Sequence, residues 1–205
     1  LPVQKRRVGY LFQDYALFPN MTVLQNILCG AGDRKKASEY VKRFFLEGKE
    51  QLYPAQLSGG QKQRTAMARM LAGGPEILML DEPFTALDNY LKMQLERELM
   101  NVMEDYGKTV LFVSHDRNEA YRMTDRIAVM EDGQILDVQP KEELFQNPAS
   151  LAATLLTGCK NVSMLQAESD SGYAAADWGI RLSAPSEEGS YKYAAFRAHY
   201  FQVVP

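Results

Sequence analysis

Short apolar runs alternate along much of the chain with segments of helical periodicity. The runs fall at residues 7–12, 77–80, 109–113 and 126–130. Unbroken runs of this length are typical of strands buried on both faces of a parallel sheet. Between them, residues 89–105 form a predicted helix with an apolar face made by Leu91, Leu95, Leu99, Val102 and Met103. This alternation predicts an α/β layer.

Two further stretches complete the predicted organisation. Residues 20–72 follow a turn signal at Pro19 and have mostly helical character, which predicts a helical subdomain. From residue 159 onward the pattern changes to short alternating pieces that are punctuated by Gly172, Gly179 and Gly189. We therefore predict an α/β domain over residues 1–158 and a small β-rich accessory segment over residues 159–205.

Composition excludes several classes of protein. The 205 residues carry 23 basic and 26 acidic side chains, a net charge of −3, which argues against wholesale nucleic-acid binding. No apolar run approaches the ~20 residues of a membrane span. Cys29 and Cys159 have neither metal-site spacing nor a disulfide framework, so a reduced cytosolic setting is expected.

A helix predicted to begin at Ser58 has the features of an anion site. Ser58 and Gln61 have the spacing of a capping box. Capping alone does not require Gly59 and Gly60, each of which costs about 1 kcal/mol of helix propensity. Two residues without side chains let an anion approach the N–H groups at the positive end of the helix. We therefore expect this helix to bind a phosphate.

Polar side chains also follow three of the predicted strands. Asp81 and Glu82 end one strand, and Gln13 and His115 follow two others. Ligands of open α/β sheets bind at the carboxyl ends of the strands. One acid there suits Mg²⁺, and a second suits the orientation of an attacking water. These side chains therefore predict a nucleotide site, although a lone histidine is more often structural.

Together these residues resemble the ATPase subunits of ABC transporters, which have a P-loop NTPase fold. LSGGQ at residues 57–61 is similar to the family signature, and ILMLDEP at residues 77–83 to its Walker B strand. TALD at residues 85–88 resembles the D-loop. Gln13 and His115 fit the Q-loop and the switch histidine. The resemblance extends from Arg7 to about Gly158 in order and in spacing.

The resemblance implies ATP and Mg²⁺ as cofactors and ATP hydrolysis coupled to import. It makes Glu82 the catalytic base, with His115 and Gln13 beside the same nucleotide, and assigns Mg²⁺ to Asp81 and Gln13. In this family two subunits face head to tail, so each signature contacts the nucleotide of the other subunit. The implied nucleotide contacts are Ser58, Gly59, Gly60, Gln61 and Asp88.

The resemblance also implies partners and a location. A second copy of the chain forms the homodimer, membrane permease subunits receive the motion, and a periplasmic or extracellular substrate-binding protein acts indirectly. The expected place is the cytoplasmic face of the membrane, as a peripheral subunit, with no nucleic-acid partner.

The phosphate-cradling loop of the family is absent from the 205 residues. The triplet Gly-Lys-Thr at residues 107–109 lacks the glycine five residues earlier, where Val102 stands, and it precedes a strand instead of following one. In the family this loop lies before the Q-loop. We therefore expect the chain to begin after it, to be incomplete at its N-terminus, and to be inactive by itself.

The C-terminal segment narrows the predicted substrate. LTGCKNVS at residues 156–163, DWGI at residues 177–180 and FRAHYF at residues 196–201 resemble the link into the accessory β-domain of molybdate importers. Molybdate or tungstate is thus the expected cargo, and the resemblance implies that the accessory segment, residues 159–205, is incomplete at its end. Sulfate, polyamine and sugar importers share the general plan and stay open as alternatives. So do a soluble ABC ATPase acting on DNA or ribosomes, and a non-catalytic regulatory fragment.

Overall fold

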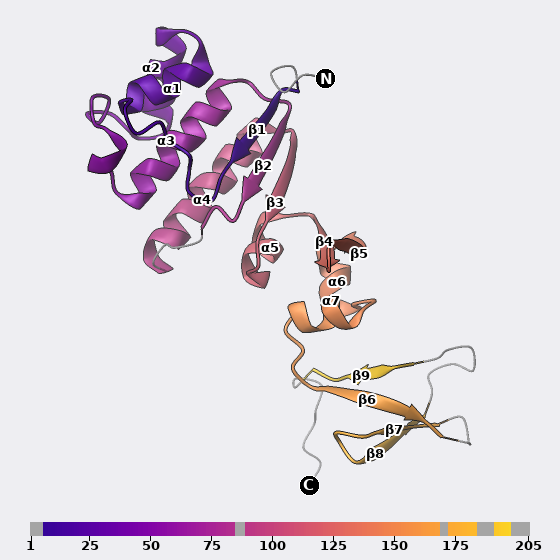
Figure 1. Ribbon diagram of the computed structural model, residues 1–205. Coiled ribbons are helices and arrows are strands. Elements are labelled where there is room, and N and C mark those ends of the chain that lie inside the picture. The colour runs from indigo at the N-terminus through magenta and orange to yellow at the C-terminus, as the bar shows by residue number, and fades with distance from the viewer. Residues whose placement is uncertain (1–5, 85–88, 169–171, 184–190, 198–205) are drawn as a thin grey trace. The chain divides into compact units, whose positions relative to one another are not determined.

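The computed structural model describes residues 6–84, 89–168, 172–183 and 191–197. The chain divides into two compact units, Leu1–Met123 and Thr124–Pro205 (Figure 1). The division falls before the fourth predicted strand, whereas the sequence pattern placed a boundary near residue 158. Each unit is described by itself below.

The first unit contains a three-stranded parallel sheet. Its strands are β1 (Val8–Leu11), β2 (Ile77–Asp81) and β3 (Thr109–Val113), in the order β1-β2-β3. Tyr10 pairs with Met79 and Met79 with Leu111, so all three strands run side by side in one direction. The predicted parallel α/β layer is therefore confirmed for these three strands.

Helices cover one face of this sheet. Leu11, Leu78 and Leu80 are buried together with Leu95 and Leu99 of α4 (Asn89–Tyr106). The opposite face carries exposed apolar side chains, namely Val8, Tyr10, Ile77, Leu111 and Val113. The expectation that the apolar runs are covered on both faces is therefore wrong for the described residues, because the helices that pack on the sheet bury alternate side chains only.

Three helices form the predicted helical region. They are α1 (Val23–Ala31), α2 (Arg34–Arg43) and α3 (Gly59–Ala72), with a short 3-10 turn, η2 (Pro54–Gln56), before α3. Helices α1 and α3 pack so closely that a Cβ on Gly30 would lie 1.9 Å from the backbone oxygen of Arg69. Glycine at position 30 is therefore what allows the two backbones to touch.

The second unit begins with a hairpin that the sequence analysis did not predict. Strand β4 (Arg126–Glu131) pairs antiparallel with β5 (Gln134–Pro140), in a sheet separate from β1-β2-β3. Asp132 and Gly133 join them with φ values of 49° and 76°. An Asp-Gly pair with positive φ at both residues is a strong hairpin signal. It accounts for the pairing of residues 126–130 with the strand that follows them.

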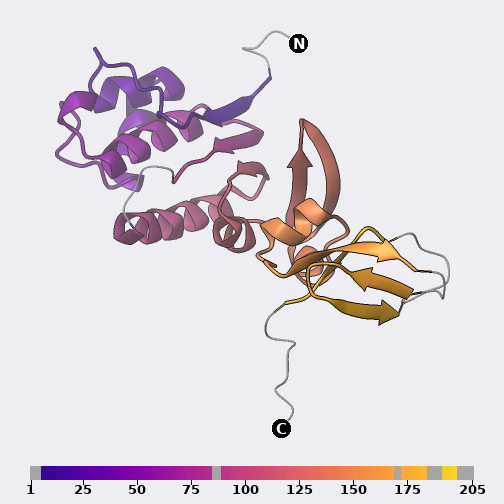
Figure 2. The ribbon, with the colours of Figure 1, turned by 60° about the horizontal axis from the view of Figure 1, so that its bottom comes forward.

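Two short helices and a second sheet complete this unit. Helices α6 (Lys141–Gln146) and α7 (Leu151–Leu156) pack against the hairpin through Leu144, Ala153 and Val129. After them comes an antiparallel sheet of order β8-β7-β6-β9, visible in both ribbon views (Figure 2). Its strands are β6 (Val162–Ala167), β7 (Gly172–Ala175), β8 (Ile180–Ser183) and β9 (Tyr193–Ala195). The residues after 158 are thus rich in strand, as expected.

Candidate active site at the carboxyl ends of the parallel strands

Polar side chains gather where the three parallel strands end. Asp81 is the last residue of β2, and Glu82 follows it directly. Gln13 comes two residues after β1, and His115 comes two residues after β3. Because the strands are parallel, all of these residues are brought to the same edge of the sheet.

Glu82 is the centre of this group. Its Oε1 lies 3.1 Å from Nδ1 of His115, and Nε2 of Gln13 donates a hydrogen bond of 3.5 Å to its Oε2. The Glu82 side chain is 29% exposed, whereas that of His115 is 74% exposed. An ionised carboxylate can only accept hydrogen bonds, so Nδ1 of His115 is the donor in this contact. The structure therefore joins three of the predicted catalytic residues in one contact network.

The backbone of Glu82 is held in an unusual conformation. Its φ is 42°, in the left-handed region that residues with a side chain rarely adopt. Its N–H donates to the carbonyl of Val113 at 3.0 Å, which anchors the residue to β3. Strain of this kind gathers at functional sites and is maintained by the surrounding structure. The sheet thus fixes the direction in which the Glu82 side chain leaves the backbone.

Asp81 has a partner that the sequence analysis missed. The hydroxyl of Tyr10 donates to Oδ2 of Asp81 at 2.7 Å. This hydrogen bond, with some burial and the nearby negative charge, raises the pKa of Tyr10 above its ordinary value. The available signal was strand alternation, since Tyr10 and Asp81 fall on the same face of adjacent strands.

The helix that the sequence predicted to bind a phosphate, α3, has the predicted cap. Ser58 caps α3 and accepts from the N–H of Gln61 at 3.3 Å, while Oε1 of Gln61 accepts from the N–H of Ser58 at 3.0 Å. Gly59 and Gly60 form the first turn of the helix, where backbone N–H groups lack intrahelical partners. Ser58 and Gln61 thus hydrogen-bond to each other. Gln13, Glu82 and His115 form a separate contact network at the edge of the sheet.

Asp88 and the Mg²⁺ site are the two remaining parts of the predicted site. Asp88 and the rest of the TALD stretch lie outside the described residues. Within the described residues, no three His, Cys, Asp or Glu side chains form a metal cluster. Mg²⁺ usually binds one or two protein carboxylates and completes its shell with water and substrate phosphates, so a single half-buried Asp81 fits that ion.

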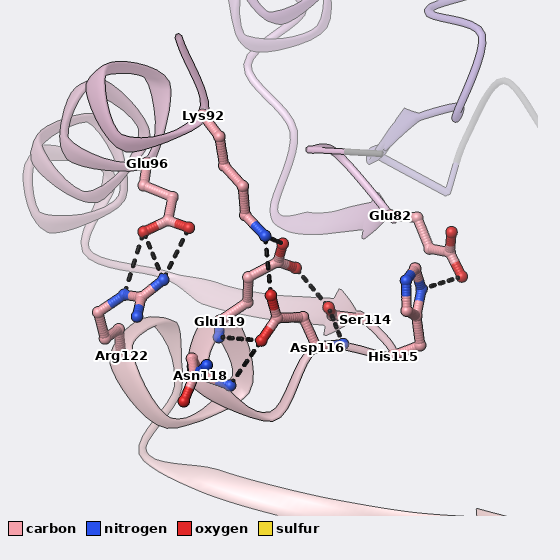
Figure 3. A network of polar contacts seen from close by, with 9 residues as sticks. All are labelled: Glu82, Lys92, Glu96, Ser114, His115, Asp116, Asn118, Glu119 and Arg122. Atoms are coloured by element: carbon pink, nitrogen blue, oxygen red, sulfur yellow. Dashed lines mark hydrogen bonds and ion pairs between the residues drawn. The ribbon is translucent and has the colours of Figure 1, made fainter. Parts of the chain in front are cut away.

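The turn that carries His115 is held by a cluster of charges (Figure 3). Nζ of Lys92, from α4, lies 2.8 Å from Oδ2 of Asp116 and 2.6 Å from Oε1 of Glu119, which belongs to α5 (Arg117–Met123). The neighbouring ammonium holds the pKa of Asp116 below its ordinary value, and the backbone N–H groups of Asn118 and Glu119 act in the same direction. Burial lowers the pKa of Lys92, but the hydrogen bonds and negative charges of Asp116 and Glu119 outweigh this effect, and the pKa lies above its ordinary value.

These pKa shifts predict how acid acts on the fold. A carboxyl whose pKa is depressed by folding contributes stability above its unfolded pKa, and that contribution is lost as pH falls through the folded pKa. We expect Asp116→Asn to flatten the decline in the free energy of unfolding as the pH falls below about 5, as measured by urea denaturation. Asp105→Asn is the control, because the ion pair of Asp105 with Arg43 lies on the open surface and contributes little. An unchanged decline in Asp116→Asn would contradict the prediction.

Comparison with known proteins shows which fold the chain has. Residues 1–85 match the family model described as ABC transporter. The dimeric structure of the ATP-binding cassette MJ0796 bound to ADP and Pi superimposes with a TM-score of 0.57 and 36% identity, covering 67% of this chain and 65% of that one. The chain has the fold of an ABC ATPase.

Curated ABC relatives show the same likeness in sequence. The sulfate/thiosulfate import ATP-binding protein CysA 1 of Rhizobium meliloti is 41% identical over a 181-residue alignment that covers 81% of this chain and 52% of that protein. The Fe(3+) ions import ATP-binding protein FbpC of Haemophilus influenzae is 41% identical over a 166-residue alignment that covers 77% of this chain and 47% of that protein. The chain thus spans about half the length of the curated relatives it matches. Among the helices of the described residues, none has the length and apolar character needed to cross a membrane.

Proposed function

We propose that this ABC ATPase chain serves as an ATP-hydrolysing subunit that drives an importer. The observation that carries the proposal is Glu82, held between Gln13 and His115 at the carboxyl edge of a parallel sheet. The resemblance of the surrounding motifs to ABC ATPases and the likeness to importer ATPases agree with it.

Each residue then has a definite task. Glu82 accepts the proton of the attacking water, and His115 and Gln13 orient that carboxylate. Asp81 and Gln13 hold Mg²⁺, which neutralises charge on the phosphates when it is bound. Ser58, Gly59, Gly60, Gln61 and Asp88 contact the nucleotide of a second copy of the chain, since two bare residues leave the helix N–H groups accessible to phosphate.

The proposal includes further partners and a location. Two copies assemble head to tail, in line with the dimeric cassette that the chain resembles in fold. Permease subunits receive the motion, a substrate-binding protein acts on the far side of the membrane, and the subunit sits at the cytoplasmic face. The motion reaches the permease through the loop after Gln13.

That loop is built to present an aromatic side chain. The Arg69 side chain donates to the carbonyls of Ala16 at 2.9 Å and Tyr15 at 3.2 Å, and its guanidinium lies 5.2 Å from the centre of the Phe18 ring. Asn26 accepts from the N–H of Phe18 at 2.9 Å. Phe18 nevertheless stays 44% exposed. A held loop with an exposed apolar residue suits a docking surface for a short permease helix.

Replacing Phe18 by glutamate tests this docking surface. We expect substrate uptake to fall by about tenfold or more while ATP hydrolysis persists. A charge buried at the contact would weaken docking of the permease helix by at least about 1.4 kcal/mol, which corresponds to a factor of about ten. Uptake and ATPase activity are measured in membranes that contain the assembled importer. Phe45→Glu, at another exposed phenylalanine, is the control. Unchanged uptake in Phe18→Glu would contradict the docking role.

We propose a tetrahedral oxyanion as cargo, with molybdate or tungstate as the first candidate. The support is the resemblance of residues 156–163, 177–180 and 196–201 to the molybdate importers. Sulfate is the second candidate, because a sulfate/thiosulfate relative is 41% identical to the chain over the 181 aligned residues. An iron relative is equally similar, so identity in the ATPase region does not decide the cargo. Uptake of labelled molybdate and sulfate in cells with and without the gene distinguishes the candidates.

ATP hydrolysis is tested with two proteins. The 205-residue chain alone is expected to show no turnover above background, since positioning of the phosphates carries most of phosphoryl-transfer catalysis and no G-x-x-x-x-G-K-[ST] is present. A P-loop chimera, in which the P-loop segment of a sulfate/thiosulfate relative precedes Leu1, is expected to hydrolyse ATP. The same chimera with its P-loop lysine changed to alanine is the control. A folded chimera without turnover would contradict the proposed function.

A further inference from the structure

Residues on both sides of His115 in the sequence take part in the cluster of charges around Lys92. Asp116 and Glu119 share the Lys92 ammonium. The hydroxyl of Ser114 donates to Oε2 of Glu119 and accepts from the N–H of Asp116 at 3.0 Å. The residues before and after His115 are thus tied to one cation, while the histidine itself reaches out to Glu82 (Figure 3).

The charged side chains of this cluster are largely shielded from water, so removal of one of them has a larger effect than it would on the open surface. The Lys92 side chain is 20% exposed and that of Glu119 is 7% exposed. Ion pairs on the open surface contribute little, whereas removal of one partner from a shielded cluster leaves an uncompensated charge. Loss of the ammonium would therefore leave two carboxylates close together, and their repulsion would open the turn.

A second contact joins the same two helices one turn further along. Arg122 of α5 donates from Nε and Nη2 to the two carboxylate oxygens of Glu96 on α4, at 3.0 and 2.8 Å. Lys92 and Glu96 are four residues apart on α4 and so lie on one face of that helix. Two sets of ion pairs therefore hold α5 against α4. The set at Lys92 also holds the turn that carries His115.

We propose that Lys92 is a positioning residue that sets the contact between His115 and Glu82. It fixes the turn after β3 relative to α4, so that a displacement at the start of α4 is transmitted to the histidine. The role in turnover rests on the proposed function, whereas the effect on the contact between His115 and Glu82 does not. Lys92 touches neither of these two residues, so it acts through the geometry of the turn.

The first test reads the His115 imidazole by ¹H–¹⁵N NMR in the 205-residue chain. The sequence has two histidines, and His115→Gln assigns the signals. We expect a Nδ1–H tautomer in the wild type and averaged, free-imidazole shifts in Lys92→Met. Lys92→Arg keeps the charge and is expected to keep the wild-type spectrum. Arg43→Met removes the separate ion pair with Asp105 of α4 and serves as the matched control.

Several outcomes overturn the proposal. A folded Lys92→Met with wild-type His115 signals does so, as does an equal change in Arg43→Met or a Lys92→Arg spectrum that matches Lys92→Met. If Lys92→Met does not fold, Glu119→Gln gives the same readout with a milder change. A folded Glu119→Gln with unchanged His115 signals then counts against the role of the cluster.

The second test uses the P-loop chimera. We expect Lys92→Met to lower kcat by about tenfold or more and to leave the KM for ATP within about twofold, because the change affects orientation and not substrate binding. A general loss of fold would lower the amount of active enzyme and the stability of the chain together. A Lys92→Met chimera with wild-type kcat overturns the role in turnover. An inactive unmutated chimera contradicts the proposed function and leaves the NMR test of positioning intact.

Discussion

Replacing Glu82 by glutamine in the P-loop chimera is expected to lower ATP turnover by about 100-fold or more. General base catalysis by a positioned carboxylate contributes roughly 10²–10⁴ in rate. The amide keeps the size of the side chain, but its single carbonyl oxygen can accept from only one of Gln13 and His115. It also has no basic oxygen to take a proton from water. Binding of ATP should persist, so the closed dimer is expected to accumulate.

The measurements are steady-state phosphate release and the fraction of dimer in the presence of ATP. Glu76→Gln is the matched control, because Glu76 precedes the same strand and pairs with Arg7 on the open surface. It should retain turnover close to that of the unmutated chimera. Near-normal turnover in Glu82→Gln would show that another group is the base.

Replacing Gly30 by alanine is expected to destabilise the first unit by about 2 kcal/mol. The new Cβ would meet the backbone oxygen of Arg69 at 1.9 Å, and neither backbone is free to rotate away as a side chain would. Overpacking of this kind costs about 3 kcal/mol, from which about 1 kcal/mol of improved helix propensity is recovered. Urea denaturation followed by circular dichroism measures the loss.

Gly73→Ala is the control for that substitution. Its Cβ would lie 3.3 Å from the backbone oxygen of Met70, and its φ of −67° suits alanine. We expect a change within about 1 kcal/mol. Equal losses in Gly30→Ala and Gly73→Ala would show that the contact between α1 and α3 is not what requires glycine.

Much of the candidate site could be predicted because its signals are local. The apolar runs of β2 and β3 place Asp81, Glu82 and His115 at strand ends, and parallel pairing brings such ends to one edge. The cap at Ser58 is encoded within four residues, and the structure forms it as written. The same locality applies to the Asp-Gly pair of the β4–β5 hairpin, although that signal was overlooked.

The sequence by itself determined which side chains stand at the ends of the strands and which helix begins with two glycines. The reason is that hydrophobic periodicity and helix capping depend on residues that are only a few positions apart. Only the tertiary structure decided how these groups meet. The hydroxyl of Tyr10 reaches Asp81 across 71 positions of chain, and Lys92 reaches Asp116 across 24. Such contacts depend on strand register and on how α4 packs beside α5, and neither is encoded in the residues that surround the contact.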